Sequence, residues 1–210
     1  MFATAFDVVG HTVEIAKIED KHIAPLWTLL QEEENIRLYR QLYHIDPTSE
    51  EDLGRDLLAS SQNNLDTKAT RAIINKFTSD VLGWLIVRSQ DPDTSAMTAE
   101  AAMFLPRALR SERGTETMYY VSHTVFDNLD YEKLEFRAGT SSEAWGPGGG
   151  QLGRSLIGVL TRQMLDRGRS AESDLFVVMK AQWPVISLAI GAWLDSKGST
   201  KVERAVGTSS

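Results

Sequence analysis

The chain has 210 residues, of which 42% are hydrophobic and 24% are charged, and these fractions are typical of one globular domain with an apolar core. Its 29 acidic and 22 basic residues give a net charge of −7, which argues against nucleic acid or a membrane as the main partner, because both attract positive surfaces. There is no cysteine, so disulfides and thiolate metal sites are excluded. Without a recognisable signal peptide or an apolar stretch of membrane-spanning length, the protein is expected to be cytoplasmic.

The first half of the sequence predicts strands and helices in alternation. Residues 13–18 alternate apolar and polar side chains as a strand does, and residues 20–30 carry apolar side chains at helical spacing. A second helical stretch starts at Pro47, where Thr48 and Ser49 can cap a first turn rich in acidic residues. Three strands are expected next, at residues 69–77, 81–88 and 96–105.

The second half of the sequence continues this alternation with a long amphipathic helix at residues 115–129 and a strand at residues 134–138. The last expected elements are a hairpin at residues 155–164 and 174–180 and a terminal helix at residues 183–194. Strands interleaved with helices predict one α/β or α+β domain around a mixed sheet, covering residues 1–196. Residues 197–210 are expected to form a disordered tail.

Two segments of the sequence carry the pattern of a known family. Residues 104–139 match F-S-P-x-x-Q-R-x-x-x-A-T-E-A, an amphipathic helix and L-G-Y-R-R-V-E-W, and the C-terminal run GVLTRQMLDRGRSAESDLFVVMKAQWP resembles the end of the same pattern. The matching residues of the first segment are Phe104, Pro106, Arg110, Thr115, Glu116, Phe126, Leu129, Tyr131 and Glu135. Over residues 8–190 the chain therefore resembles the GCN5-related N-acetyltransferases (GNAT) of the RimJ/RimL-like branch. The resemblance implies an α+β fold, an α/β/α sandwich with a mixed, mostly antiparallel sheet.

The resemblance also implies where a cofactor would bind. In the family, the helix after the fourth strand holds the pyrophosphate of coenzyme A at its N-terminus, through free N–H groups and the helix dipole. This role falls here on Arg110, Arg113, Gly114 and Thr115. The family's loop Q/R-x-x-G-x-G/A is altered, because Leu109 and Glu112 replace its polar first residue and its first glycine. Two like charges about 5 Å apart cost on the order of 3 kcal/mol before screening, so Glu112 is expected to oppose binding unless the RSER segment is a self-paired, solvated helix cap.

The segment GPGGG, residues 146–150, occupies the place of a helix that lines the cofactor in the family. Glycine costs ~1 and proline ~3 kcal/mol per helical position relative to alanine, so these five residues oppose a helix by roughly 7 kcal/mol. A phosphate-binding loop would open a helix after a strand, and a linker would separate unrelated segments, and neither condition is met. A remodelled cofactor wall is therefore expected.

Several side chains are candidates for chemistry or for a pocket. Because the ordinary pKa of a histidine side chain lies near neutrality, His44 can act as a general acid or base, oriented by Tyr43 or Asp46. An exposed loop histidine is the competing interpretation. Glu100 lies in the apolar strand TAEAAMF, where a carboxylate needs either a function or a partner. The candidate pocket residues are Trp84, Trp145 and Arg40, which compete with core packing and a solvated surface. The histidines lack an acidic cluster at ligand spacing, so no metal site is predicted.

Two altered cofactor motifs lead to three hypotheses of function. The first is a GNAT-fold enzyme that works on a small organic molecule without acetyl-CoA, such as a natural-product tailoring enzyme for cyclisation, isomerisation or decarboxylation. The second is an acetyl-CoA-dependent N-acetyltransferase of the RimJ/RimL type, and the third is a non-catalytic binding protein. A small-molecule partner is expected in each enzyme case, and related folds suggest a homodimer.

Overall fold

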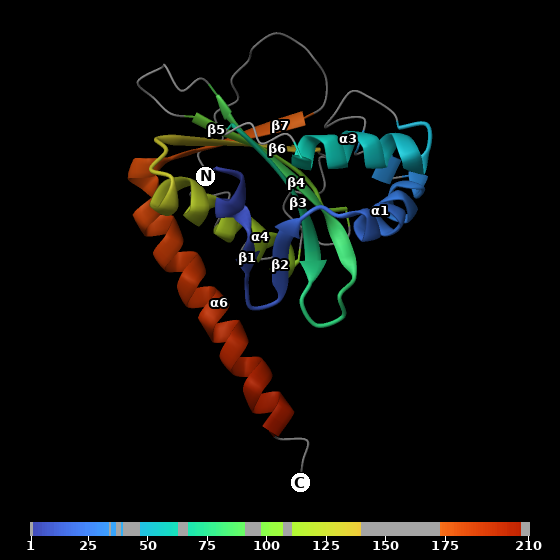
Figure 1. Ribbon diagram of the computed structural model, residues 1–210. Helices are drawn as coiled ribbons and strands as arrows, with labels where there is room; N and C mark the ends of the chain where they lie inside the picture. Colours follow the sequence, from blue (N-terminus) through green and yellow to red (C-terminus); the bar gives the residue numbers. More distant parts are fainter. Residues whose placement is uncertain are drawn as a thin grey trace.

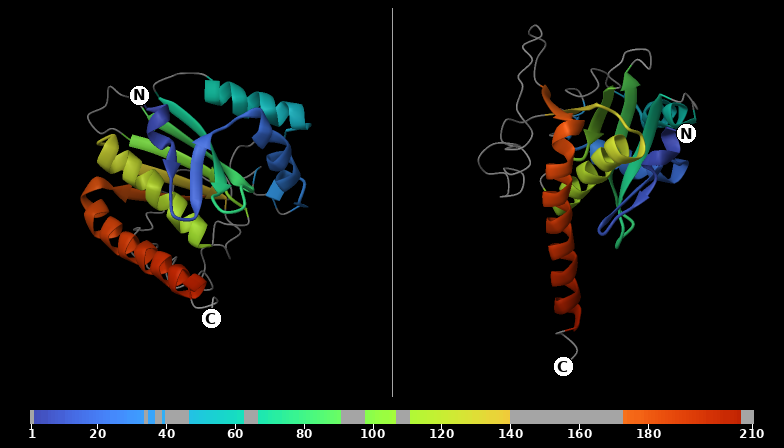
Figure 2. Two further views of the ribbon diagram at one scale, coloured as in Figure 1. Left: turned by 60° about the horizontal axis from the view of Figure 1, so that its bottom comes forward. Right: turned by 90° about the vertical axis from the view of Figure 1, so that its left-hand side faces the viewer.

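The computed structural model of the chain describes residues 2–33, 35, 36, 39, 47–62, 67–90, 98–106, 111–139 and 173–206. These residues form one curved sheet with helices on both of its faces (Figure 1). Helices α1 and α3 lie on one face, and α4 and α6 lie side by side on the other (Figure 2). Within this described part, no helix is both long enough and apolar enough to cross a membrane.

The elements follow the predicted order, with a few additions. In the first half they are η1 (Ala3–Phe6), β1 (Val8–Val9), β2 (Val13–Lys17), η2 (Asp20–His22), α1 (Ile23–Leu30), α3 (Glu50–Gln62), β3 (Lys68–Asn75) and β4 (Val81–Gln90). In the second half they are β5 (Thr98–Phe104), α4 (Glu112–His123), η3 (Thr124–Asn128), β6 (Lys133–Gly139), β7 (Ser173–Met179), η4 (Lys180–Gln182) and α6 (Trp183–Val206). The short elements η1 and β1 are not predicted by the sequence patterns, because two to four residues are too few to show a period.

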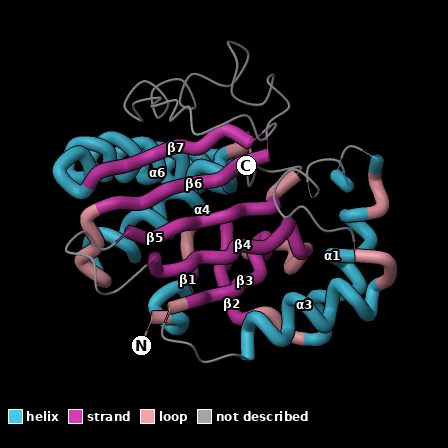
Figure 3. The backbone as a smooth tube through the Cα atoms, turned by 90° about the horizontal axis from the view of Figure 1, so that it is seen from above, coloured by secondary structure: helices cyan, strands magenta, loops and turns pink. Residues whose placement is uncertain are grey.

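The sheet has seven strands in the order β1-β2-β3-β4-β5-β6-β7, and the tube in Figure 3 shows this order from above. Every neighbouring pair is antiparallel except β5 and β6, which are parallel and are separated in the sequence by α4. A parallel pair needs a crossover connection, and α4 supplies it. The predicted mixed, mostly antiparallel sheet in an α/β/α sandwich is therefore confirmed.

Side-chain caps decide where three helices begin. The Ser49 hydroxyl accepts a hydrogen bond from the Asp52 N–H at 3.1 Å, which confirms the predicted capped start of α3. Ser111 caps α4 and starts this helix three residues earlier than the expected residue 115. The predicted helix at residues 20–30 opens instead as the 3₁₀ turn η2, which is capped by Glu19 before α1 begins.

Two apolar cores lie on opposite faces of the sheet. One includes Leu85 and Val121 under α4 and α6, and the other includes Trp84 and Leu26 under α1 and α3. Neighbouring residues on β4 thus serve different cores, because side chains alternate across a strand. Full burial of each such side chain contributes about 1.5–3 kcal/mol to folding.

The C-terminal part of the chain differs from the prediction in one respect. Helix α6 continues past residue 194 to Val206, into the segment that we expected to be a disordered tail. No proline follows Pro184, and lysine, glutamate, arginine and alanine in this segment favour a helix once it has started. The second strand of the predicted hairpin is present as β7, whereas its first strand, at residues 155–164, lies outside the described residues.

Candidate functional site

The parallel strands β5 and β6 part at one end of the sheet. Their pairing runs from Thr98 opposite Lys133 to Ala102 opposite Arg137. Beyond this point β5 continues for two residues paired only with β4, and β6 continues for two residues paired only with β7, among the described pairs. The strand edges that face each other there have no strand partner, so their main-chain groups are available to a ligand inserted between them.

Helix α4 starts beside this opening, since it follows the C-terminal end of β5 after a short connection. The Ser111 hydroxyl accepts hydrogen bonds from the N–H groups of Arg113 at 3.2 Å and Gly114 at 3.4 Å. The positive end of the helix dipole therefore lies at the mouth of the opening, where it favours an anion.

The predicted cofactor residues Arg113, Gly114 and Thr115 all lie in the first turn of α4, and Arg110 lies outside the described residues. The Nε atom of Arg113 is buried and has no hydrogen-bond partner among the described residues. Glu112 is half-buried in the same turn. The turn thus carries one cation and one anion in addition to the dipole, and they act on a bound phosphate in opposite directions.

A buried carboxylate fixes α4 to the sheet. Glu116 is fully buried and accepts hydrogen bonds from the main-chain N–H of His11 and from both the N–H and the hydroxyl of Thr12, in the turn between β1 and β2. At Gly10 an added Cβ would lie 2.5 Å from Cε2 of Tyr120 and still nearer to the Glu116 carboxylate. The family pattern includes Glu116, but its partners could not be predicted, because main-chain donors are present in every residue type except proline.

Glu100 lies at the middle of β5, two residues before Ala102, which is the last β5 residue that pairs with β6. Across the sheet it stands opposite Arg88 of β4 and Glu135 of β6. Glu135 is paired with Lys133, whose Nζ lies 2.8 Å from its Oε1. Glu100 is half-buried and stands among charges of both signs on the neighbouring strands.

Trp84 of β4 is fully buried rather than at a surface. Its ring centroid lies 4.2 Å from that of Phe104 and 5.7 Å from that of Tyr39. The indole therefore packs in the core on the α1 side, next to the C-terminal end of β5. The other predicted site residues, namely Tyr43, His44, Asp46, Arg40 and Trp145, lie outside the described residues, as does the GPGGG segment.

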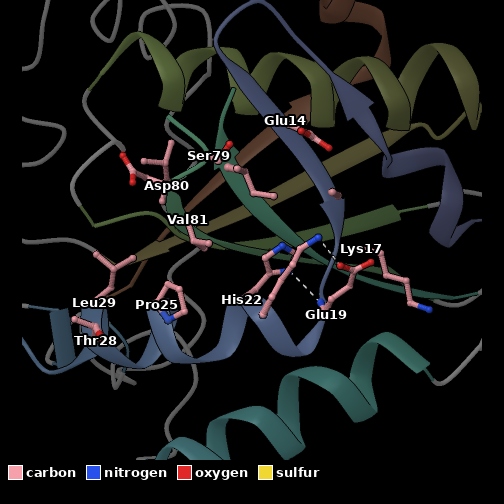
Figure 4. Close-up of a pocket in the computed structure, with 14 residues that line it drawn as sticks. Glu14, Lys17, Glu19, His22, Pro25, Thr28, Leu29, Ser79, Asp80 and Val81 are labelled. Atoms are coloured by element: carbon pink, nitrogen blue, oxygen red, sulfur yellow. Dashed lines mark hydrogen bonds and ion pairs between the residues drawn. The ribbon is translucent and has the colours of Figure 1, made fainter. Parts of the chain in front are cut away.

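A separate cavity of about 960 Å³ lies between α1 and the ends of β2, β3 and β4 (Figure 4). Its walls combine apolar side chains, among them Leu29 and Val81, with the charged Glu14 and the buried His22. The sequence offers no reason to select His22 as a site residue, because His22 stands in an otherwise ordinary helical pattern. Among the described residues, no group of three or more His, Cys, Asp or Glu is arranged to hold a metal ion.

The fold is shared with solved acetyltransferase structures. One is a GCN5-related N-acetyltransferase from Brucella melitensis, at 21% identity and a TM-score of 0.64, with 89% of this chain and 84% of that chain covered. Another is an acetyltransferase of the GNAT family from Bacillus anthracis, at 10% identity and a TM-score of 0.58, with 81% and 96% covered. A third is FdhC, a nucleotide-linked sugar GNAT, at 11% identity and a TM-score of 0.61, with 90% and 98% covered.

No protein-family model and no curated protein matches the chain. The structural neighbours therefore establish the fold, while the RimJ/RimL-like branch stays a prediction from the sequence. They give no support to a tailoring reaction that does without acetyl-CoA, and the acetyltransferase alternative fits them better. This chain has the GNAT fold. The evidence is the parting of β5 and β6, the N-terminus of α4 beside them, and the solved neighbours.

Proposed function

We propose that the protein is an acetyl-CoA-dependent N-acetyltransferase, which moves an acetyl group from the thioester to a primary amine. The observation that carries the proposal is the parting of β5 and β6 beside the N-terminus of α4. A cofactor with a long arm and a charged head needs both parts at once, an open strand edge for the arm and a positive helix end for the head.

The first turn of α4 would hold the diphosphate. Its helix dipole favours an anion, and the buried Nε of Arg113 has no other partner among the described residues. A buried N–H group without an acceptor costs stability, and a bound phosphate would supply the missing acceptor of the Arg113 Nε. The residues present therefore fit the cofactor, and Glu112 reduces the affinity without removing the site.

The open edge of β5 would bind the arm. Around Met103 and Phe104 its main-chain groups can hydrogen bond to amides, as they would to an added strand. A main-chain N–H at this edge can also stabilise the negative charge that develops on the acetyl oxygen when the amine attacks. Acetyl-CoA supplies an activated acyl group, so the chain needs to add orientation, charge stabilisation and proton transfer.

Glu100 is the described residue best placed to move a proton. An attacking amine must be neutral, and a carboxylate near the opening can take its proton, directly or through a water. As the C–N bond forms and the C–S bond breaks, the proton lost by the nitrogen is available to the leaving thiolate. His44, with Tyr43 or Asp46, stays a second prediction for this role.

Binding of acetyl-CoA tests the proposal, measured by isothermal titration on the full chain. Arg113→Gln removes one phosphate partner and is expected to weaken binding about tenfold, whereas Glu112→Gln removes a repulsion and is expected to tighten it severalfold. Arg55→Gln is the matched control, because Arg55 is an exposed arginine of α3 that pairs with Asp52. Absence of saturable binding to the unmodified chain would reject the proposal.

Turnover tests the role of Glu100. Release of free thiol from acetyl-CoA in the presence of a panel of amines is expected, and Glu100→Gln should lower kcat by about 10²-fold at neutral pH. The dissociation constant of acetyl-CoA should stay within about twofold, because Glu100 lies away from the α4 turn that holds the charged head. An equal loss of binding and turnover would assign Glu100 a structural role instead.

A further inference from the structure

The cavity between α1 and the ends of β2, β3 and β4 is separate from the opening between β5 and β6. Its lining comes from β2, η2, α1, β3, β4 and the turn between β3 and β4, and none of the described lining residues belongs to β5, β6 or α4. In Figure 4 the residues of η2 and α1 form one wall, and Ser79, Asp80 and Val81 face them across the space. At about 960 Å³ the cavity is large enough for a small organic molecule.

His22 presents a hydrogen-bond donor to this space. The side chain is only 4% exposed, and its Nδ1 accepts a hydrogen bond from the Glu19 N–H at 3.0 Å. Because an accepting Nδ1 carries no proton, the neutral ring carries it on Nε2. Within the described part of the chain no hydrogen bond reaches Nε2, and this atom is not fully buried, so the cavity wall presents a donor that has no protein acceptor and is accessible to a ligand.

Glu14 adds a hydrogen-bond acceptor, its carboxylate, to the same cavity. Its side chain is half-buried on β2 and lines the same cavity. The carboxylate forms no hydrogen bond or ion pair with other described residues. The second carboxylate of this wall, Glu19, is already paired with Lys21 at 2.6 Å. Glu14 and His22 line the same cavity, so the donor and the carboxylate can serve one ligand.

Apolar side chains form part of the remaining walls. Pro25 and Leu29 of α1 face Ile74 of β3 and Val81 of β4 around the space. These side chains suit a branched aliphatic group, because burying it removes apolar surface of both partners from water. The cavity therefore offers the His22 donor, the Glu14 carboxylate and an apolar surface, next to further polar side chains such as Lys17, Ser79 and Asp80.

We propose that this cavity binds a small primary amine that also carries a carbonyl oxygen and an aliphatic side chain. Glu14 holds the ammonium group, Nε2–H of His22 donates to the carbonyl oxygen, and the aliphatic group packs against Leu29 and Val81. The site needs no acetyl-CoA, so it stands or falls independently of the acetyltransferase activity.

Leucinamide is a suitable probe, titrated calorimetrically into the full chain at neutral pH without acetyl-CoA. Two shortened probes divide its contacts: 4-methylpentanamide lacks the amine, and 3-methylbutylamine lacks the carboxamide. Saturable binding of leucinamide is expected, with each shortened probe bound about tenfold more weakly, as for the loss of one charge-assisted or buried hydrogen bond.

Two variants assign the contacts to residues. Glu14→Gln should erase the preference for leucinamide over 4-methylpentanamide and keep the preference over 3-methylbutylamine. His22→Asn should do the reverse, because its side-chain oxygen can still accept from the Glu19 N–H while Nε2–H is lost. Glu51→Gln, in the exposed first turn of α3, is the control and should change neither preference.

Circular dichroism of each variant ensures that a loss of binding is not a loss of folding. The proposal is overturned if leucinamide does not bind the folded chain, or if it binds with the same preferences after both substitutions. Leucinamide binding lost only through substitutions at the β5–β6 opening would place the amine there and equally overturn the assignment.

Discussion

Within the part of the chain that the structure describes, the side chains of Glu116 and His22 are held by main-chain N–H groups rather than by opposite charges. The carboxylate of Glu116 accepts from N–H groups of the β1–β2 turn, and the imidazole of His22 accepts from the Glu19 N–H. A main-chain N–H can only donate, so it selects the acceptor form of its partner. Each of these two contacts therefore fixes the position of its side chain, and for His22 it also favours the neutral ring.

Glu116→Gln should destabilise the fold. The amide keeps one acceptor oxygen but turns its NH₂ group toward donors, so at least one buried N–H loses its partner, at a cost of about 2–3 kcal/mol. Chemical denaturation measures the change in the free energy of unfolding, with the exposed Glu51→Gln as a control that should stay within about 0.5 kcal/mol. Equal stability of the two variants would show that the Glu116 contacts contribute nothing.

His22 should make stability depend on pH. Burial lowers the pKa of His22 below its ordinary 6.5, so on acidification the unfolded chain takes up this proton before the folded chain does. Stability should therefore fall as the pH decreases from about 6.5 to the lowered pKa, and level off below it with respect to this group.

Denaturation curves of the unmodified chain and of His22→Asn across this pH range check the assignment. The variant lacks the titrating ring, so its stability should decline less between pH 6.5 and the lowered pKa. Parallel pH profiles for the two proteins would assign the acid sensitivity to other groups.

At the scale of elements, the junction between α4 and α6 depends on a change of helix type. After His123 the helix widens to the π-helical turn η3, which carries Asp127. The Asp127 carboxylate accepts a hydrogen bond from Nε1 of Trp183 at 2.7 Å, and the Trp183 ring packs 5.6 Å from that of Phe126. The first residue of α6 is therefore joined to the end of α4 by both a polar and an apolar contact.

Trp183→Phe should separate these two contributions. Phenylalanine keeps much of the aromatic packing but cannot donate to Asp127, so a loss of about 1–2 kcal/mol is expected from the hydrogen bond to a carboxylate and the smaller ring. Trp27→Phe, in the half-buried part of α1, controls for the change in ring size without a recorded donor contact. The comparison uses the midpoint of thermal unfolding, and equal shifts would mean that the Asp127 bond is unimportant.

Most of the elements could be predicted from the sequence, and the reasons for the failures are specific. The strands of the sheet alternate clearly enough to locate, and Ser49 is a strong capping signal in front of α3. The start of α4 was missed because Ser111 stands inside a charged segment that did not show the apolar period. The hairpin strand β1 and the turn η1 were missed because they are too short to have a period at all.

The candidate site was predictable only in part. The resemblance to the family assigned Arg113 and Gly114 to the loop before the helix and Thr115 to its start, whereas the structure has all three in the first turn of α4. The buried state of the Nε of Arg113 and the contacts of Glu116 depend on residues distant in the sequence, so no local pattern could reveal them. His22 was missed for the same reason, because its cavity is assembled from five separate elements and a turn.

At the scale of the whole molecule, both cores depend on the same sheet. Adjacent residues such as Trp84 and Leu85 of β4, or Ala72 and Ile73 of β3, point into opposite cores. Loss of the packing on one face therefore removes support from the strands that the other face needs. This coupling favours a single cooperative unfolding transition in spite of the length of the chain.

Substitutions in the two cores should therefore lower the same transition. Leu26→Ala, on α1, and Val121→Ala, on α4, are each expected to lower the free energy of unfolding by about 2–4 kcal/mol, because both side chains are fully buried. Far-ultraviolet circular dichroism and tryptophan fluorescence should report one midpoint for each variant. Two resolved midpoints, with each substitution shifting a different one, would contradict the coupling.

The close approach of Gly10 to Glu116 also has an evolutionary meaning. Any side chain at position 10 would collide with the carboxylate at position 116, so neither position is free to drift alone. Homologues that acquire alanine or a larger residue at the first position should have traded the glutamate for something shorter. Such paired exchanges, in a turn and a helix more than a hundred residues apart, would indicate that selection preserves the contact that holds α4 to the sheet.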